Sequence, residues 1–389
     1  MSWILNLKNP PKSFAVSAKR IIFLGMVLLF FASILEVPIW KLWHRFHKPP
    51  QRHQANAMQK LEFYSKDFVI SQTYGPFEAP LDEKQWTLLS DEKPQTLWIR
   101  GFSVVPVSPD GKMLLPKEFL YYANLDFLDY NFHRQIFRSR PIGSHRLFAV
   151  FEGHEKIQFP KGYGIPVLSN EFLRFNVIPL NLNAKNQTVR LKFKIEIDFV
   201  RDADLAQPLK PLFVATAGGM KLLLGRDGYY GIEKVDPVVQ EARSLSGIHA
   251  LDDGRYTVGD SFGRKFSFYW VLKPGKEMNP TLVTQLLNLP FDTTLHYADA
   301  HLYPYAESLE LKDLTAGQTI LELSAKPLEK GLGLLQIEHF TSEAGVPLYK
   351  GHEYEVITTY LNTSGVDQKA MATLFLYLED KDLQSPNHR

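Results

Sequence analysis

The sequence predicts a mainly β protein in which two jelly-roll or β-sandwich domains follow a single N-terminal transmembrane helix. Three observations lead to this prediction: one long apolar segment near the N-terminus, many short segments of alternating polarity after it, and glycine and proline turns between those segments. The expected parts are an N-terminal tail (1–20), the transmembrane helix (21–40), a juxtamembrane linker (41–60), a first β-sandwich domain (61–207), a second β-sandwich domain (208–380) and a C-terminal tail (381–389).

The apolar segment occupies residues 21–40 with the sequence IIFLGMVLLFFASILEVPIW, in which Glu36 is the one charged residue. An α-helix rises about 1.5 Å per residue, so this segment would be roughly 30 Å long, which is the thickness of the hydrocarbon core of a bilayer. Basic residues flank it on both sides, and Trp40 and Trp43 mark its C-terminal end, as membrane interfaces favour. The segment lacks a small-x-small cleavage site, so we expect an uncleaved single-pass anchor in preference to a signal peptide or a buried helix of a soluble protein.

The charges around the anchor do not fix its orientation. Basic residues are equally frequent on its two sides, which makes the positive-inside rule indecisive. Common single-span anchors keep the N-terminus in the cytoplasm, and on that basis we expect the globular region to be extracytoplasmic. The basic residues compared are Lys8, Lys12, Lys19 and Arg20 before the segment and Lys41, Arg45, Lys48 and Arg52 after it.

Composition limits the function classes. The chain is 45% hydrophobic and 13% aromatic, which is sufficient for the cores of two domains. Its 44 basic and 42 acidic residues nearly cancel to a net charge of +2, so we expect no nucleic acid partner. The absence of cysteine excludes disulfides, thiolate metal sites and a cysteine nucleophile.

The clearest strand covers residues 188–200, TVRLKFKIEIDFV, where apolar and charged residues alternate. One face of this strand is therefore apolar and the other is charged, which is typical of an antiparallel strand with one solvated face. Residues 207–217, QPLKPLFVATA, follow it and contain two prolines, so we place the domain boundary there. Further strands are expected at residues 96–108, 265–272, 319–325, 352–361 and 372–378.

Generic catalytic motifs are absent from the sequence, with one exception. No phosphate-binding loop, His-Glu-x-x-His zinc motif or dinucleotide-binding glycine motif occurs. Residues 259–263, GDSFG, fit the Gly-x-Ser-x-Gly pattern of a nucleophile elbow, with Ser261 in the serine position. That elbow requires a helix after the serine, whereas the following residues, KFSFYWVL, predict a strand. A glycine-rich turn is therefore the better interpretation of this motif.

Two C-terminal segments carry a family resemblance. LPFDTTLHYADAHLYPYAESLELKDLTAG (residues 289–317) and GVPLYKGHEYEVITTYLNTSGVDQKAMATLFLYL (residues 345–378) resemble the second domain of the copper type II monooxygenases, which include peptidylglycine alpha-hydroxylating monooxygenase and dopamine beta-monooxygenase. The resemblance implies a copper site made by a His-x-His pair and a methionine, where oxygen is activated. The corresponding residues are His301, Tyr303 and Met371, so one of the three ligands is changed.

The first domain resembles the same family more weakly. SPDGKMLLPKEFLYYANLDFLDYN (residues 108–131) is similar to the region in which the family has paired histidines for a second, electron-supplying copper. Tyr121 and Tyr122 stand at that pair, and Ile178 takes the place of a third histidine. The resemblance covers most of residues 95–378. It implies a retained fold with depleted copper sites, and hydroxylation by the family's mechanism requires both metals.

The changed ligands favour a protein that is not an enzyme. Neutral imidazole and thioether groups suit copper in both oxidation states, whereas an unperturbed phenol ionises only near pH 10, roughly. We therefore expect no catalytic residue and no cofactor. We expect His301 and Met371 to be packed between sheets, with the three tyrosines filling the former metal pockets or an interface.

Two functional hypotheses follow from these features. The first is a non-catalytic, membrane-anchored scaffold or accessory subunit that stabilises or docks on a membrane protein complex. The alternative is a copper-binding protein or monooxygenase with altered ligands, in which His301, Tyr303 and Met371 form a degenerate copper site. A fold alone does not choose between them, because one scaffold hosts unrelated functions. Stoichiometric co-purification with membrane subunits favours the first hypothesis, and tightly bound copper favours the second.

Overall fold

The computed structural model describes residues 58–74, 79–89, 93–137, 145–183, 187–224, 231, 257–259 and 263–383. All of these residues belong to one compact unit, Ala55–Arg389, and the other unit is Met1–Gln54. The predicted N-terminal tail and transmembrane helix, most of the predicted linker, and Ser261 lie outside the described residues. No helix among the described residues is long and apolar enough to cross a membrane.

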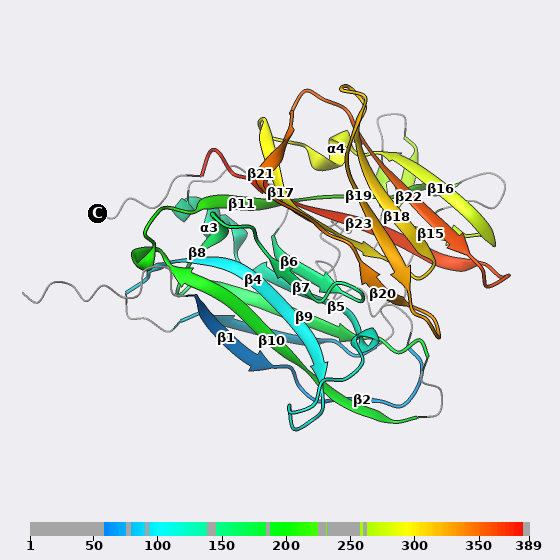
Figure 1. The fold of residues 1–389 in the computed structure, drawn as a ribbon, viewed down its shortest axis with the longest axis horizontal. Coiled ribbons are helices and arrows are strands. Elements are labelled where there is room, and N and C mark those ends of the chain that lie inside the picture. Colours follow the sequence, from blue (N-terminus) through cyan, green and yellow to red (C-terminus); the bar gives the residue numbers. More distant parts are fainter. Residues whose placement is uncertain are drawn as a thin grey trace, which may run out of the picture. The chain divides into compact units, whose positions relative to one another are not determined.

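The first half of the described region contains two antiparallel sheets, which we call the N-terminal sandwich (Figure 1). Its elements are β1 (Gln59–Tyr64), β2 (Phe68–Ile70), β3 (Asp82–Thr87), β4 (Thr96–Val107), η1 (Lys117–Phe119), β5 (Leu120–Phe127), α3 (Tyr130–Phe137), β6 (Arg146–Phe151), β7 (Lys156–Gln158), β8 (Tyr163–Leu168), β9 (Phe172–Pro179), β10 (Val189–Arg201) and η2 (Asp202–Asp204). One sheet has the strand order β1-β10-β4-β8, with β2 beside β10 and β7 beside β4, and the other has the order β3-β9-β5-β6. Aromatic side chains fill the space between them, and the ring centroids of Phe102 and Phe148 are 5.7 Å apart.

The second half, which we call the C-terminal sandwich, is coloured from green to red in Figure 1. Its elements are β11 (Lys210–Gly218), β12 (Lys221–Leu222), β13 (Thr257–Gly259), β14 (Lys265–Ser267), β15 (Tyr269–Leu272), β16 (Gly275–Leu282), α4 (Thr284–Leu287), β17 (Thr293–Leu302), β18 (Ala306–Asp313), β19 (Gln318–Pro327), β20 (Leu334–Ile337), β21 (Phe340–Leu348), β22 (Tyr354–Asn362) and β23 (Gln368–Glu379). The order β11-β23-β17-β21, with β15 beside β23, packs against the order β16-β22-β18-β19-β20. Trp270 of β15 and Tyr360 of β22 meet between these sheets with ring centroids 5.8 Å apart.

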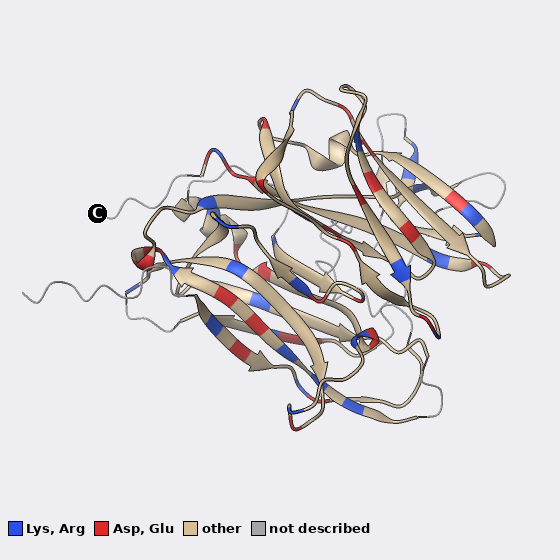
Figure 2. Ribbon diagram, viewed as in Figure 1, with Lys and Arg blue, Asp and Glu red and all other residues tan. Residues whose placement is uncertain are grey.

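The strand predicted at residues 188–200 is confirmed as β10. Its apolar residues from Leu191 to Val200 are buried, whereas Lys194 and Glu196 are only half-buried. Lys60 in the neighbouring strand β1 donates to Glu196 at 2.8 Å, and Figure 2 shows the alternating charges along these strands. The other predicted strands are also present, although residues 265–272 form two strands, β14 and β15, that pair in different sheets. A strand, β14, therefore follows the GDSFG motif, as expected if this motif is a glycine-rich turn and not a nucleophile elbow.

The two sandwiches share one sheet and one core. Strands β8 and β11 pair in parallel, with Lys210 opposite Tyr163, so the order β1-β10-β4-β8-β11-β23-β17-β21 is continuous. The buried apolar side chains of both halves belong to a single cluster. The predicted domain boundary after residue 207 falls in the connection between η2 and β11. The chain is a mainly β, sandwich-like protein with several antiparallel sheets.

Candidate functional site

Strand β17 places a row of polar side chains in the interior of the protein. In its sequence, TTLHYADAHL, Tyr297, Asp299 and His301 alternate with small or apolar residues, and nearly every residue of the strand is buried. Because side chains alternate across a strand, these three share one face. That face contacts β6 of the N-terminal sandwich, where Phe151 stacks on His301 with ring centroids 4.9 Å apart. The polar row therefore lies at the contact between the two sandwiches.

A β-bulge in β5 turns two consecutive tyrosines toward His301. The register of β5 against β9 shifts between Leu120 and Tyr122. A bulge adds one residue to a strand and re-aims the side chains beside it. The ring centroids of Tyr121 and Tyr122 consequently lie 5.4 Å and 5.3 Å from that of His301. His301 is thus surrounded by aromatic rings that come from both sandwiches.

A pair of hydroxyl groups links the two sandwiches beside His301. The hydroxyl oxygens of Tyr121, in β5, and Tyr303, just after β17, are 2.8 Å apart. Each of these tyrosines is only 3% exposed. A hydrogen bond in such a low-dielectric environment is stronger than one in water, and losing either partner leaves the other hydroxyl buried. We refer to this contact as the hydroxyl pair.

Tyr122 is held by charged neighbours within the N-terminal sandwich. Arg146 in β6 donates a hydrogen bond from Nη1 to the Tyr122 hydroxyl, and its Nε lies 2.8 Å from Oδ1 of Asp126. Burial raises the pKa of Tyr122 above its ordinary value, so the phenol stays protonated at neutral pH. A protonated phenol beside a guanidinium cation is a poor environment for a metal ion.

Burial also sets the protonation state of His301. The residue is 3% exposed. Burial lowers the pKa of His301 to about 3, because the charged imidazolium would lose its hydration. The imidazole is therefore neutral near pH 7. Its Nδ1 has no hydrogen-bond partner among the residues that the structure describes.

Met371 lies next to Tyr303, but its sulfur is engaged elsewhere. The backbone N–H of Tyr303 donates to the carbonyl oxygen of Met371 at 3.2 Å. The Met371 sulfur accepts a hydrogen bond from the Thr373 hydroxyl at 3.3 Å. The predicted ligands His301, at the end of β17, Tyr303, just after it, and Met371 of β23 are thus neighbours. The Tyr303 hydroxyl and the Met371 sulfur are both engaged in other hydrogen bonds.

Other hydrogen bonds engage two of the three predicted ligands of the first copper site. Copper requires several nitrogen or sulfur donors, and two of the three predicted ligands are bonded to other side chains. At the second predicted site, Ile178 lies opposite Tyr122 on paired strands and offers no donor atom. No group of three or more His, Cys, Asp or Glu side chains within the described ranges is placed to hold a metal ion. Copper binding by His301, Tyr303 and Met371 stays a prediction.

A cavity of about 500 Å³ lies beside the hydroxyl pair. Its lining includes the buried residues His301 and Glu152 and the exposed residues Asp367 and Lys369, so it extends from the interior to the surface. This volume is within the range of small-molecule sites, which is about 300–1,000 Å³. Burial raises the pKa of Glu152 to about 8, so this carboxyl group is largely protonated near pH 7. The deep part of the cavity is therefore polar but uncharged.

Sequence reasoning missed a second buried polar group, around Asp299. Neither carboxyl oxygen of Asp299 accepts a hydrogen bond from a described residue, and His154 Nε2 lies 3.5 Å from Oδ2. The same His154 nitrogen is 2.9 Å from the Tyr297 hydroxyl. Burial raises the pKa of Asp299 well above its usual range, and burial lowers the pKa of His154 to about 3, so the imidazole of His154 is neutral near pH 7. The available signal was the alternation of polar residues in HYADAHLY, which an apolar core strand lacks.

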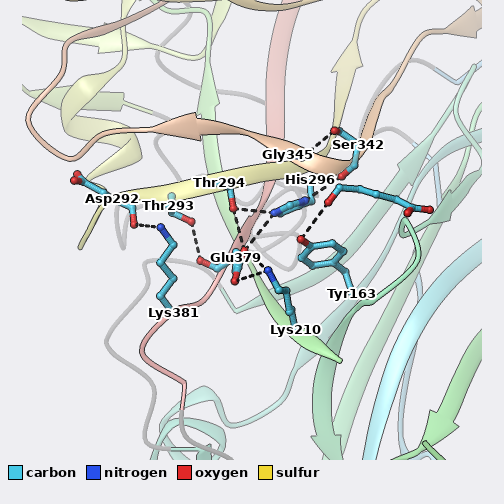
Figure 3. Close-up of polar contacts among 11 residues, drawn as sticks. Tyr163, Lys210, Asp292, Thr293, Thr294, His296, Ser342, Gly345, Glu379 and Lys381 are labelled. Carbon is cyan, nitrogen blue, oxygen red and sulfur yellow. Dashed lines mark hydrogen bonds and ion pairs between the residues drawn. The ribbon is translucent and has the colours of Figure 1, made fainter. Parts of the chain in front are cut away.

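A separate polar cluster, around His296, joins the sandwiches near the β8–β11 pair (Figure 3). His296 stacks on Tyr163 of β8 with ring centroids 3.8 Å apart. Its Nδ1 is 2.9 Å from the carbonyl oxygen of Ser342 and therefore donates to it. Its Nε2 lies 2.8 Å from the Thr294 hydroxyl oxygen, and that hydroxyl donates to Glu379 Oε2 at 3.1 Å. Both ring nitrogens thus have a polar neighbour within 3 Å, which indicates a structural role.

Two further residues complete the cluster around His296. Glu379 lies 3.5 Å from His296 Nε2 and 3.3 Å from Lys210 Nζ, so one carboxylate contacts both β17 and β11. Gly345 has a φ of +76°, and a Cβ at this position would lie 2.5 Å from His296 Cε1. Glycine is therefore required both for the left-handed backbone and for the close approach of the imidazole.

Comparison with known proteins gives no family for this chain. No protein-family model matches it, and no curated protein matches it. Among solved structures, it is similar to a peptide-N(4)-(N-acetyl-beta-D-glucosaminyl)asparagine amidase, with 9% identity, a TM-score of 0.34, and coverage of 84% of this chain and 98% of that chain. PNGase F, a glycosylasparaginase from Flavobacterium meningosepticum, shares 8% identity at a TM-score of 0.33, with 83% and 96% coverage. The STIV MCP shares 9% identity at a TM-score of 0.31, with 84% and 98% coverage. Similarity at this level concerns the mainly β, sandwich-like fold alone.

Proposed function

We propose that this chain is a non-catalytic, membrane-anchored scaffold or accessory subunit that stabilises or docks on a membrane protein complex. The proposal treats it as a relative of the copper type II monooxygenases with two jelly-roll domains, at residues 61–207 and 208–380, and with lost copper sites. It also treats residues 21–40 as a single-pass anchor and the globular region as extracytoplasmic. The expected partners are other subunits of the complex, with no nucleic acid and no cofactor.

The observation that carries this proposal is the hydroxyl pair. Tyr121 and Tyr303 occupy positions at which the family resemblance implies copper-binding histidines, one in each domain. Their hydroxyl groups bond to each other at 2.8 Å instead. A monooxygenase of that family needs these positions for metal and oxygen, whereas here they connect the sandwiches. A direct bond between the two halves suits a rigid protein whose task is contact with a partner.

His301 supports a second candidate, a copper-binding protein or monooxygenase with altered ligands. Its ring lines the cavity, and its Nδ1 has no partner among the described residues. A neutral imidazole with an unsatisfied nitrogen is a donor that copper accepts. Under this candidate, Tyr303 and Met371 would have to give up their present hydrogen bonds. The metal content of the purified chain separates the two candidates.

Co-purification from native membranes tests the scaffold role. The full chain, carrying an affinity tag, is isolated in mild detergent after brief cross-linking, and its companions are quantified by mass spectrometry. We expect at least one membrane protein in a fixed, near-stoichiometric ratio to the chain. A matched control replaces residues 21–40 with the anchor of an unrelated single-pass protein. Partners that survive this exchange dock on the globular region, and partners that disappear dock on the helix.

A purification without partners would contradict the scaffold role. A chain that is isolated from its own membranes without any stoichiometric companion, both with and without cross-linking, contradicts the accessory-subunit role. If that chain also carries about one tightly bound copper ion, the second candidate replaces the first.

A further inference from the structure

Strand β16, at the edge of the five-stranded sheet of the C-terminal sandwich, buries polar side chains and exposes apolar ones (Figure 1). A strand with one face on a core normally shows the reverse alternation. Met278 and Leu282 are 62% and 57% exposed, whereas Glu277 is 8% exposed. The buried polar side chains are Glu277, Asn279 and Thr281, and the exposed apolar ones are Met278, Pro280 and Leu282. The outward side of β16 is therefore apolar where a solvated surface would be polar.

Hydrogen bonds of the inward side chains hold β16 in this register. Trp270 Nε1 donates to Glu277 Oε1 at 3.0 Å, and Lys221 Nζ lies 3.4 Å from the same oxygen. The backbone N–H of Met220 donates to the Thr281 hydroxyl oxygen at 3.0 Å. A slip of one residue would exchange the two sides of the strand and break these bonds. The exposed apolar row is therefore a fixed feature of the fold.

The neighbouring strand β22 extends the apolar surface. Ile357 lies opposite Pro280, and Leu361, which is 38% exposed, lies opposite Lys276. Side chains at directly opposite positions of paired strands are in contact. We call the outward side of the two strands the β16–β22 face, and its apolar members are Met278, Pro280, Leu282, Ile357 and Leu361. A contiguous exposed apolar patch of this kind marks a protein contact site.

The charges of the β16–β22 face lie at two diagonally opposite corners. Lys276 is opposite Leu361 at one end, and Glu355 is opposite Leu282 at the other end. A two-fold interface must be complementary to itself. When two such faces are stacked with their strands antiparallel, the Lys276 end of each copy lies over the Glu355 end of the other. Lys276 now contacts Glu307 at 2.9 Å, but both side chains are exposed, so this ion pair contributes little and can be exchanged.

We propose that the β16–β22 face packs on the same face of a second copy of this chain, so that Lys276 of each copy pairs with Glu355 of the other. The five apolar side chains then lie between the two ion pairs. Pro280 favours this stacking over the addition of a strand at the edge, because a proline interrupts the row of backbone donors that a further strand needs. The contact goes beyond the scaffold role and does not depend on it.

The area of the outer surface predicts a weak, reversible dimer. Together with β18 and β19, the two strands form a surface that is four strands wide. With about 4.8 Å between strands and about 3.3 Å per residue, a length of roughly eight residues gives roughly 500 Å² in each copy. Two copies would bury roughly 1,000 Å², which is at the lower end of specific interfaces. We therefore expect a dissociation constant of roughly micromolar size.

Sedimentation of the full chain in mild detergent, at about 1–100 μM, measures this dissociation constant. Leu282→Glu places a charge within the apolar patch and should raise the dissociation constant about tenfold or more, because that charge would be desolvated in the dimer. The matched control is Leu114→Glu in the N-terminal sandwich, where Leu114 is 72% exposed, and it should dimerise like the wild type. Thermal unfolding verifies that Leu282→Glu is folded, and Met278→Glu replaces it if it is not.

Exchange of the two charges tests the orientation of the copies. Lys276→Glu and Glu355→Lys should each weaken the dimer about fivefold, because each variant places like charges together at both ends of the interface. The double variant restores opposite charges and should dimerise nearly as well as the wild type. Glu355 and Leu361 are six residues apart on β22, which is roughly 20 Å, so Lys276 and Glu355 of one copy do not reach each other. Restoration therefore requires a second copy.

Four results would overturn the proposal. The first is a wild-type chain that stays monomeric over the whole concentration range. The second is a dimer that both Leu282→Glu and Met278→Glu leave unchanged, which would assign the association to another part of the chain. The third is a double charge variant that dimerises no better than the single ones. The fourth is the loss of another membrane subunit from Leu282→Glu during co-purification, with a monomeric wild type, which would assign the face to that subunit.

Discussion

Removing the two hydroxyl groups of the hydroxyl pair, one at a time and together, tests whether this contact joins the two sandwiches. Tyr121→Phe and Tyr303→Phe each delete one oxygen and keep the ring, whose centroids are 6.3 Å apart. The aromatic packing around His301 is therefore retained in each variant. Any change in stability then reports the hydrogen bond between the hydroxyl groups and the burial of the hydroxyl that is left behind.

The expected magnitude follows from the burial of both residues. Each tyrosine is 3% exposed, so a single substitution removes the bond between the two hydroxyls and leaves the partner hydroxyl largely buried, which costs about 1–3 kcal/mol. The double variant removes both hydroxyls and avoids that penalty. Its loss should therefore be smaller than the sum of the single losses by about 1 kcal/mol or more.

Urea unfolding of the full chain in mild detergent, followed by tryptophan fluorescence, gives the four free energies of this cycle. Tyr64→Phe is the matched control, because the Tyr64 hydroxyl donates to Glu62 at 3.0 Å at an exposed position. We expect the control to change stability by less than about 0.5 kcal/mol. Single variants as stable as the control, with additive effects in the double variant, would refute the reasoning that the pair joins the sandwiches.

Three further predictions concern other buried groups. Gly345→Ala should lower the free energy of unfolding by about 2–4 kcal/mol, because its Cβ would lie 2.5 Å from His296 at a φ of +76°. The control Gly365→Ala, at a φ of +75° with no neighbour within 4 Å, should lower it by about 1 kcal/mol. Equal losses of stability in thermal unfolding would contradict this prediction. Burial raises the pKa of Glu152 from 4.5 to about 8, so its contribution to stability is greatest below pH 4.5 and declines as the pH rises through 8. Between about pH 5.5 and 7.5, the wild type should therefore lose about 2 kcal/mol more stability than Glu152→Gln. Parallel curves of stability against pH for the two proteins would exclude the pKa shift. Burial lowers the pKa of His301 from 6.5 to about 3, so stability declines as the pH falls below 6.5. Between about pH 7 and 5, the wild type should lose about 2 kcal/mol more stability than His301→Gln. Equal losses in the two proteins would show that the imidazole is solvated and would contradict the prediction.

The strands were predictable because one-sided burial leaves a period of two in the sequence. The alternation of residues 188–200 predicted β10. Tyr121 and Tyr122 contact His301, and the expectation that tyrosines fill former metal positions stays a prediction. Local alternation was sufficient for β10.

The remaining features depend on tertiary contacts that leave no local pattern. The bulge in β5 turns Tyr121 and Tyr122 toward the same imidazole, which strict alternation would forbid. Glu152 belongs to a turn that carries no motif, and its raised pKa follows from burial beside the loop at Gly333. The raised pKa of Asp299 likewise follows from burial at the contact between two sandwiches that are far apart in sequence.

The measurement that tests the central claim most directly is the copper content of the full chain, purified in mild detergent after copper loading and removal of excess metal. His301→Ala and Met371→Ala are measured alongside the wild type. The hydroxyl pair and the engaged sulfur of Met371 predict no copper above the detergent blank in any of the three proteins. About one copper ion per wild-type chain, lost in both variants, would contradict the non-catalytic account and establish a metal site at these residues.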